Sequence, residues 1–158
     1  MEQSVRYAKI ISNDYINGEG VCVSFWTQGC PHHCVGCHNP ETWSFHGGIE
    51  DSEENIINTI IEAISANGIQ RNFSILGGEP LCSENRDFIK KLTKTIRTYY
   101  PTITIFCWTG YLYENIEKTY LENIDVLIDG TFDINKRDIT LKLRGSSNQR
   151  ILNLREMR

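Results

Sequence analysis

Residues 73–109 read FSILGGEPLCSENRDFIKKLTKTIRTYYPTITIFCWT, and this stretch decides the fold. The apolar run over 73–76 predicts a strand that leads into a Gly-Gly-Glu-Pro turn. Apolar residues then recur at helical spacing up to Ile96, which predicts a helix opened by Ser83 and ended before Pro101. A second apolar run after that proline predicts the next strand. Strand, helix and strand of these lengths are typical of a βα unit around a parallel sheet, with a right-handed crossover.

The same alternation continues on both sides of this stretch. VCVSFWT, at 21–27, predicts an earlier strand, and Ser52 opens a helix whose isoleucine row ends at Asn67-Gly68. Downstream, a turn at Gly110 leads into a predicted shorter helix, and DVLID at 125–129 predicts a fourth strand. The shorter helix is expected around three apolar residues: Leu112, Ile116 and Tyr120.

The chain length limits how far such a pattern can close. A complete eight-fold β/α barrel needs about 250 residues, and this chain has 158. We therefore expect an α/β fold in the form of a truncated, partial β/α barrel with a mostly parallel sheet. Residues 1–158 are expected to form a single domain, because no internal linker or repeat divides them.

Composition excludes several classes of function. The net charge of −4 gives no reason to expect a nucleic-acid or membrane-surface partner. Charged residues interrupt the amino-terminal segment, and no apolar run reaches the ~20 residues that a membrane span needs. We therefore expect a cytoplasmic protein, in which the six cysteines are not a disulfide framework.

Half of the cysteines gather in one motif, CPHHCVGC, after the predicted strand at 21–27: Cys30, Cys34 and Cys37. Three thiolates can hold a 4Fe-4S cluster with one iron left open, since such clusters usually take one cysteine per iron. The spacing also allows a structural zinc ion with one of the nearby histidines as its fourth ligand, namely His32, His33 or His38. Spacing alone leaves both alternatives open.

The remaining cysteines and histidines carry no such signal. The scattered thiols of Cys22, Cys82 and Cys107 are predicted to be buried as small apolar groups. His32, His33 and His46 are otherwise predicted to be exposed loop residues.

A resemblance to known proteins favours the iron-sulfur alternative. CxxxCxxC after one strand, followed by Gly-Gly-Glu after the next, is similar to the radical S-adenosylmethionine superfamily. Within it, the chain resembles the glycyl-radical-activating enzymes, and among these the activators of anaerobic ribonucleoside-triphosphate reductase. The order of six segments carries the narrower resemblance: NGEG (17–20), GCPHHCVGCHNPETW (29–43), LGGEPL (76–81), WTGY (108–111), DVLIDGTF (125–132) and RGSSNQR (144–150).

This resemblance implies a mechanism. Cys30, Cys34 and Cys37 would hold three irons of a 4Fe-4S cluster, and S-adenosylmethionine would chelate the fourth. Reductive cleavage of S-adenosylmethionine would yield a radical that takes a hydrogen atom from a glycine in the catalytic subunit of anaerobic ribonucleoside-triphosphate reductase. The electron would come from a low-potential donor such as flavodoxin or ferredoxin. No catalytic side chain is implied beyond the cluster and S-adenosylmethionine.

The resemblance also implies which residues surround S-adenosylmethionine. The superfamily commonly has an aromatic residue at the position of Gly36, so backbone contact with the adenine is expected here in place of stacking. The implied S-adenosylmethionine contacts are Gly36, Cys37, His38, Asn39, Gly77, Gly78, Glu79, Thr109 and Asp129. Contacts with S-adenosylmethionine or with a partner protein are implied for Arg144, Ser146, Asn148 and Arg150. An apolar cover over the cluster, or ordinary core packing, is expected from Phe25, Trp26, Trp43 and Phe45.

Three other functions remain as alternatives at this point. The chain could activate a different glycyl-radical enzyme, or act as a radical enzyme on a small metabolite. A non-catalytic zinc-binding interaction module is the alternative from another class.

Overall fold

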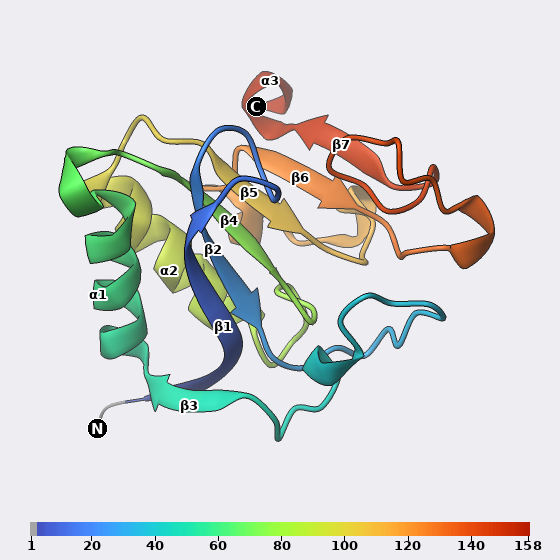
Figure 1. Ribbon diagram of the computed structural model, residues 1–158, viewed down its shortest axis with the longest axis horizontal. Coiled ribbons are helices and arrows are strands. Elements are labelled where there is room, and N and C mark those ends of the chain that lie inside the picture. Colours follow the sequence, from blue (N-terminus) through green and yellow to red (C-terminus); the bar gives the residue numbers. More distant parts are fainter. Residues whose placement is uncertain (1–2) are drawn as a thin grey trace.

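The structure is a computed structural model that describes residues 3–158. These residues form a seven-stranded sheet in the order β3-β1-β2-β4-β5-β6-β7 (Figure 1). The strands are β1 (Ser4–Asp14), β2 (Cys22–Thr27), β3 (Ile49–Ser52), β4 (Asn72–Gly77), β5 (Ile105–Trp108), β6 (Val126–Asp129) and β7 (Arg150–Asn153). Strands β2, β4, β5 and β6 are parallel, whereas β1, β3 and β7 pair antiparallel with their neighbours. The predicted α/β partial barrel is confirmed, with a parallel centre and antiparallel edges.

Two long helices, α1 (Glu53–Ile64) and α2 (Arg86–Tyr99), cover one face of this sheet (Figure 1). The Ser52 hydroxyl accepts a hydrogen bond from the Asn55 amide at 3.1 Å, which caps α1 as the sequence predicts. Short helical turns complete the structure: η1 (Pro40–Thr42), η2 (Ala66–Gly68), η3 (Tyr113–Asn115), η4 (Lys118–Leu121), η5 (Ile134–Lys136) and α3 (Leu154–Met157). No helix among the described residues has the length and apolarity to span a membrane.

The start of α2 differs from the prediction. The helix begins at Arg86 and not at Ser83, because residues 81–85 form a turn around Glu79. The Asn85 side-chain amide donates to the backbone oxygens of Gln28 (3.1 Å) and Glu79 (3.0 Å). The hydrogen bond to Gln28 ties this turn to the loop after β2.

The predicted helix around Leu112, Ile116 and Tyr120 is also wrong, because two separate 3-10 turns, η3 and η4, occupy this region. The ammonium group of Lys118 donates to the backbone oxygen of Tyr113 and, at 2.7 Å, to that of Ile116. Carbonyl groups that a continuous helix would need are therefore bonded to a side chain.

Strands β1, β3 and β7 were not predicted. The β1 sequence SVRYAKIISND mixes charged and apolar residues, and β3 and β7 have four residues each. They lie on the two flanks of the sheet, and β3 and β7 form its edges. Polar or short edge strands lack the continuous apolar run of a central parallel strand.

Side chains of the central strands alternate between the two faces of the sheet. Val23 and Ile75 join the apolar core beneath the helices. Ser24 and Ser74 are fully buried on the opposite, concave face. There, the Trp26 indole Nε1 donates to the Ser24 hydroxyl at 3.1 Å.

The NGEG segment (17–20) closes the concave face near the amino ends of β2 and β4. The Ser74 hydroxyl donates to the backbone oxygen of Asn17. Gly18 has a φ of +142°, and a Cβ atom there would lie 2.6 Å from the Cys22 Sγ atom. This motif therefore fills the floor of the partial barrel, away from the cavity described next.

Candidate active site

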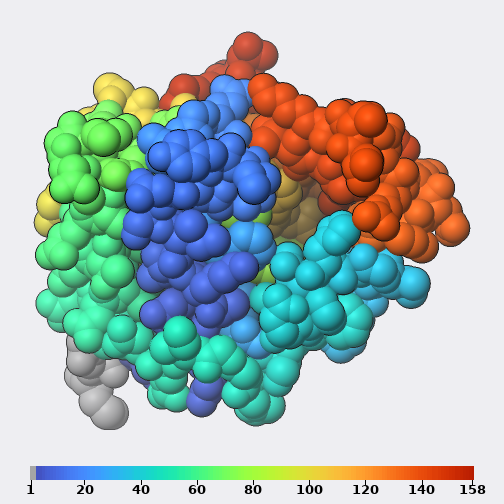
Figure 2. Space-filling view, viewed as in Figure 1, coloured from blue at the N-terminus to red at the C-terminus, as the bar shows by residue number. Residues whose placement is uncertain are grey.

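A cavity opens at the carboxyl ends of the parallel strands, where ligand sites of α/β sheets gather. Its volume is about 200 Å³. The walls come from the cysteine loop after β2, the turn after β4, residues 108–110 after β5 and residues 130–132 after β6. Figure 2 shows the molecule hollowed between the cyan cysteine loop and the orange segment that follows β6. Segments far apart in sequence therefore converge on one rim.

All three clustered cysteines line this cavity, and none is in a disulfide. Cys30 is buried, whereas Cys34 and Cys37 are half-buried. The base of the loop is closed by hydrogen bonds from the Gly29 amide to the Thr42 oxygen (2.7 Å) and from the Cys30 amide to the Trp43 oxygen (3.1 Å). These bonds fix Cys30 while leaving the other two thiols nearer the mouth.

The electrostatic surroundings favour protonated thiols in the free protein. Burial raises the pKa of the Cys30 and Cys34 thiols, and the Glu79 carboxylate adds to this effect. Metal coordination requires thiolates, so binding of iron at these sulfurs would release protons.

Three cysteine thiols line one cavity, and thiolates are the usual ligands of a 4Fe-4S cluster. Among residues 3–158, no three His, Cys, Asp or Glu side chains converge closely enough to hold one metal ion. A tetrahedral zinc site requires each sulfur about 2.3 Å from one centre. In a 4Fe-4S cluster each cysteine binds a different iron. Three cavity-facing thiols suit a cluster with one iron open to another ligand.

Glu79 is fully buried and organises the turn after β4. Its Oε1 atom accepts from His32 Nε2 and from the Gly110 amide, both at 2.7 Å. Its Oε2 atom accepts from the Thr109 hydroxyl at 2.7 Å and from the Leu81 amide at 2.9 Å. Four donors engage this carboxylate, so its geometry fixes the turn and joins the loops after β2, β4 and β5.

The prediction that His32 is an exposed loop histidine is wrong. Its side chain is 15% exposed, lines the cavity and is held by Glu79. His33 and His46 are exposed, as predicted. The burial of Cys22, Cys82 and Cys107 is also confirmed.

Gly77 and Gly78 lie where the chain leaves no room for a side chain. Gly77 has a φ of +140°, and a Cβ atom there would lie 2.2 Å from the Thr27 Oγ1 atom. A Cβ atom on Gly78 would lie 2.6 Å from the Gly29 backbone oxygen. The turn can therefore bring bare backbone to the cavity wall, which both glycines line.

The segment around the third cysteine divides between the cavity and the surface. Cys37, His38 and Asn39 line the cavity, but Gly36 is exposed and is not among the lining residues. Gly36 has a φ of +78°, and a Cβ atom there would lie 2.7 Å from the Ile134 Cδ1 atom. Gly36 therefore permits close packing between the cysteine loop and η5.

Two residues for which the family resemblance implies contact with S-adenosylmethionine are held by hydrogen bonds within the protein. Thr109 lines the cavity, but its hydroxyl donates to Glu79. Asp129 does not line the cavity; its carboxylate accepts from the Tyr113 amide at 2.8 Å and pairs with Arg150. Hydrogen bonds with Asp129 raise the pKa of the Arg150 guanidinium above its usual value. In this structure the Asp129 carboxylate is therefore held by Tyr113 and Arg150.

The RGSSNQR segment reaches the cavity through residues that were not predicted. Gly145 and Gln149 line the wall, and the Gln149 amide nitrogen donates to the Gly130 oxygen at 3.0 Å. The four residues singled out from sequence bond within the protein instead. Arg144 donates to the Gln149 oxygen, Ser146 accepts from the Asp133 amide, Asn148 donates to the Thr131 oxygen, and Arg150 pairs with Asp129 and Glu114.

One of the four aromatic residues expected near the cluster lines the cavity, namely Trp43. Phe25 belongs to the core beneath the helices. Trp108 and Phe132 also line the wall and were missed, although both belong to segments that carry the family resemblance. The Trp108 indole donates to the Leu143 oxygen at 2.8 Å, which ties the segment after β6 to the sheet.

An open α/β sheet with three cysteines at its carboxyl edge defines an iron-sulfur protein, and residues 16–152 match the family described as "4Fe-4S single cluster domain". A solved structure, QueE from Escherichia coli, shares the fold with a TM-score of 0.50 and 15% identity, over 84% of this chain and 72% of that chain.

Relatives with more than 30% identity name a narrower group. An anaerobic ribonucleoside-triphosphate reductase-activating protein from Enterobacteria phage T4 is 36% identical over 93% of both chains. The protein of the same name from Escherichia coli is 35% identical over 96% of this chain and 100% of its own, and that from Pasteurella multocida is 33% identical over 92% and 95%. The chain belongs to the family of anaerobic ribonucleoside-triphosphate reductase-activating proteins.

Proposed function

We propose that this chain is a radical S-adenosylmethionine activase that generates a glycyl radical in anaerobic ribonucleoside-triphosphate reductase. The observation that carries the proposal is the convergence of three cysteine thiols and the Gly77-Gly78 turn on one cavity. When bound, the 4Fe-4S cluster and S-adenosylmethionine supply reductive carbon–sulfur cleavage and hydrogen-atom abstraction from the glycine.

The chain's own residues bind, orient and shield these groups. Cys30, Cys34 and Cys37 would hold three irons as thiolates. The backbone carbonyl groups of Gly77 and Gly78 would accept from the methionine ammonium group, in a turn whose shape Glu79 maintains. Because four protein donors already engage Glu79, its role in this proposal is to position the turn.

Further wall residues limit access of water and recognise the nucleoside. Trp43, Trp108 and Phe132 give the cavity an apolar lining. The backbone at 37–39 lines the cavity and would lie beside the adenine. Hydrogen-atom transfer needs no general base, so a wall without a catalytic carboxylate pair suits this chemistry.

The open side of the partial barrel supports a protein substrate. The cavity mouth lies between the cysteine loop and the segment after β6 (Figure 2), where a glycine-bearing loop of the reductase catalytic subunit can enter. We propose that residues 1–158 act as one radical S-adenosylmethionine domain in the cytoplasm. A low-potential donor such as flavodoxin or ferredoxin supplies the electron, and the function involves no nucleic acid or membrane.

Anaerobic reconstitution tests this function. The parent protein is expected to bind a 4Fe-4S cluster, to release 5′-deoxyadenosine under reducing conditions and to give a glycyl-radical doublet by electron paramagnetic resonance with the reductase subunit. Cys34→Ala should lose iron and S-adenosylmethionine cleavage together. Cys82→Ala is the matched control, because Cys82 is buried outside the cavity.

Two results would contradict the proposal. Full S-adenosylmethionine cleavage by Cys34→Ala would refute the ligand assignment. A colourless parent protein that takes up zinc, and never releases 5′-deoxyadenosine after reconstitution, would favour the zinc-binding module.

A further inference from the structure

We propose that His32 is a positioning residue that fixes the cysteine loop against the Gly-Gly-Glu turn and so sets the surroundings of the iron-sulfur cluster. The inference rests on the proposed function, because it assumes a cluster on the three cysteines. It concerns an imidazole that lies in the sequence between two of the proposed ligands, Cys30 and Cys34.

A hydrogen bond defines the position of the imidazole. His32 Nε2 lies 2.7 Å from Glu79 Oε1, and the two side chains are 15% and 1% exposed. Thr109, Gly110 and Leu81 supply the other donors to this carboxylate. Since a carboxylate accepts hydrogen bonds, we assign the shared proton to Nε2 of His32.

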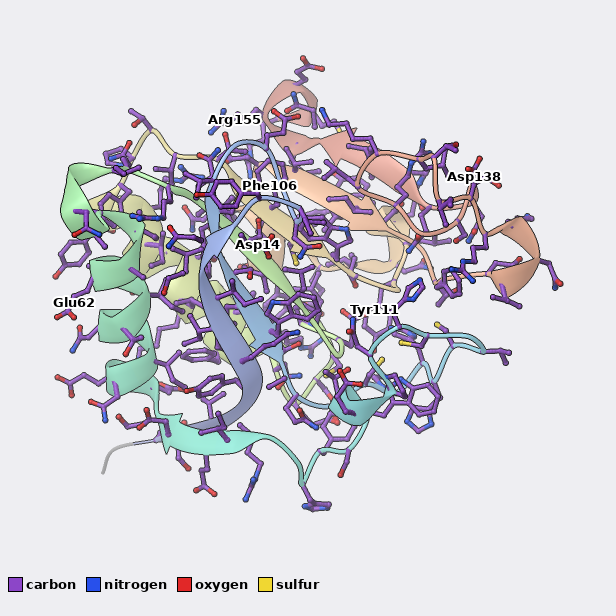
Figure 3. All side chains as sticks on the ribbon, viewed as in Figure 1. Asp14, Glu62, Phe106, Tyr111, Asp138 and Arg155 are labelled. Atoms are coloured by element: carbon purple, nitrogen blue, oxygen red, sulfur yellow. The ribbon has the colours of Figure 1, made fainter. Side chains whose placement is uncertain are left out.

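Packing fixes the same ring from two other directions. The imidazole meets the Tyr111 ring edge-on, with centroids 4.7 Å apart, and Tyr111 is labelled beside the cysteine loop in Figure 3. A Cβ atom on Gly110 would lie 2.6 Å from the imidazole, so the glycine makes room for it. His32 is thus wedged between the turn after β4 and the loop after β5.

This link acts on the part of the loop that carries the proposed ligands. The backbone amide of Cys30 already donates a hydrogen bond to the Trp43 oxygen, which fixes Cys30. The loop tip is more open, with Val35 77% exposed. His32 connects this outer part to a buried carboxylate, and its loss would leave Cys34 and Cys37 less well placed to grip the cluster.

The neighbouring histidine provides a matched control. The His33 ring stacks on Trp43, with centroids 4.6 Å apart and planes 9° apart, and His33 is exposed. It has the same chemistry one residue away but no hydrogen bond to Glu79 among the described contacts. If the loop only required a histidine at either position, substitutions of His32 and of His33 would have equal effects.

The test compares His32→Leu, His32→Gln, His32→Asn and His33→Leu. In cluster-free protein, hydrogen exchange is measured over residues 31–38. In reconstituted protein, the rate of iron loss to a chelator and the electron paramagnetic resonance spectrum of the reduced cluster are measured. His32→Leu should speed both exchange and iron loss by about tenfold or more, as expected for loss of one charge-assisted hydrogen bond, and should alter the spectrum.

Glutamine places an amide nitrogen near the position of Nε2, whereas asparagine is too short to reach Glu79. His32→Gln should therefore stay within about threefold of the parent protein, and His32→Asn should behave like His32→Leu. His33→Leu should match the parent protein. If His32→Leu does not fold, the comparison of glutamine with asparagine decides the question.

Equal exchange and iron loss in the parent protein, His32→Leu and His32→Asn would overturn the inference, as would an equally large effect of His33→Leu. Failure of the parent protein to hold a 4Fe-4S cluster would instead overturn the proposed function. The exchange measurement on cluster-free protein separates these two results, because it tests the His32 link without iron.

Discussion

Replacing Glu79 by glutamine tests whether this buried carboxylate holds the turn together. Four donors converge on its two oxygens, and the side chain is 1% exposed. Glutamine replaces one carboxylate oxygen by an amide nitrogen, which cannot accept hydrogen bonds, so the two donors that face it lose their acceptor. A hydrogen bond to a charged group contributes about 1.5–3 kcal/mol, so two lost bonds remove about 3–6 kcal/mol.

Part of this loss is offset because a charge is no longer buried, and we expect a net destabilisation of about 3 kcal/mol. In a domain of this size that corresponds to a fall in Tm of about 6–12 °C. The assay is thermal unfolding of cluster-free protein, followed by circular dichroism without oxygen. The measured quantity is the difference in Tm between Glu79→Gln and the parent protein.

Glu62→Gln is the matched control, since Glu62 is exposed on α1 and points away from the sheet (Figure 3). Its Tm should lie within about 2 °C of the parent value. A Glu79→Gln protein that melts as close to the parent as this control does would refute the reasoning, because the four hydrogen bonds would then contribute no net stability.

Three further substitutions test other parts of the structure. Gly77→Ala, which puts a Cβ atom against Thr27 at a positive φ, should lower the free energy of unfolding in urea by about 3 kcal/mol, and an unchanged midpoint would contradict this. Burial acts to raise the pKa of Asp14, but hydrogen bonds from Asn17 and the Ile16 amide outweigh it, so its pKa lies below the usual value. The stabilisation from ionised Asp14 is therefore present above about pH 4 and lost as the pH falls. In urea titrations from about pH 5 to about pH 3, Asp14→Asn should lose less stability than the parent protein. A decline as steep as that of the parent protein would contradict this. Cys107→Ser should cost about 1–3 kcal/mol by burying a hydroxyl group yet bind as much iron as the parent protein, and a loss of iron would show that the thiol is not merely structural.

The centre of the fold follows from local sequence, whereas its edges do not. The spacing of isoleucines predicts the buried side of α1, and the apolar runs of β2 and β4 predict buried strands. Strand β3 instead depends on pairing with β1, supported by a contact between Arg6 and Glu50 at 3.1 Å. The local contact of Lys118 with the carbonyl groups of Tyr113 and Ile116 interrupts the helix expected near Ile116. A long-range hydrogen bond from Asn85 to the Gln28 oxygen holds the turn that precedes α2.

The candidate site divides in the same way. The clustered cysteines and the Gly-Gly-Glu turn were found from sequence because their spacing and strand-end positions are local signals. His32 was missed, since its partner Glu79 is 47 residues away and an isolated loop histidine carries no sign of that contact. Gln149 was also missed, because its role depends on where the chain folds back onto Gly130.

Side chains along β2 and β4 alternate between the two faces of the sheet, which has a practical consequence for protein engineering. Val23 and Ile75 make the apolar contacts under the helices, while Leu76 and the turn that follows it belong to the cavity wall. Thermostability can therefore be increased by repacking one side of the sheet while the reactive side keeps its native residues.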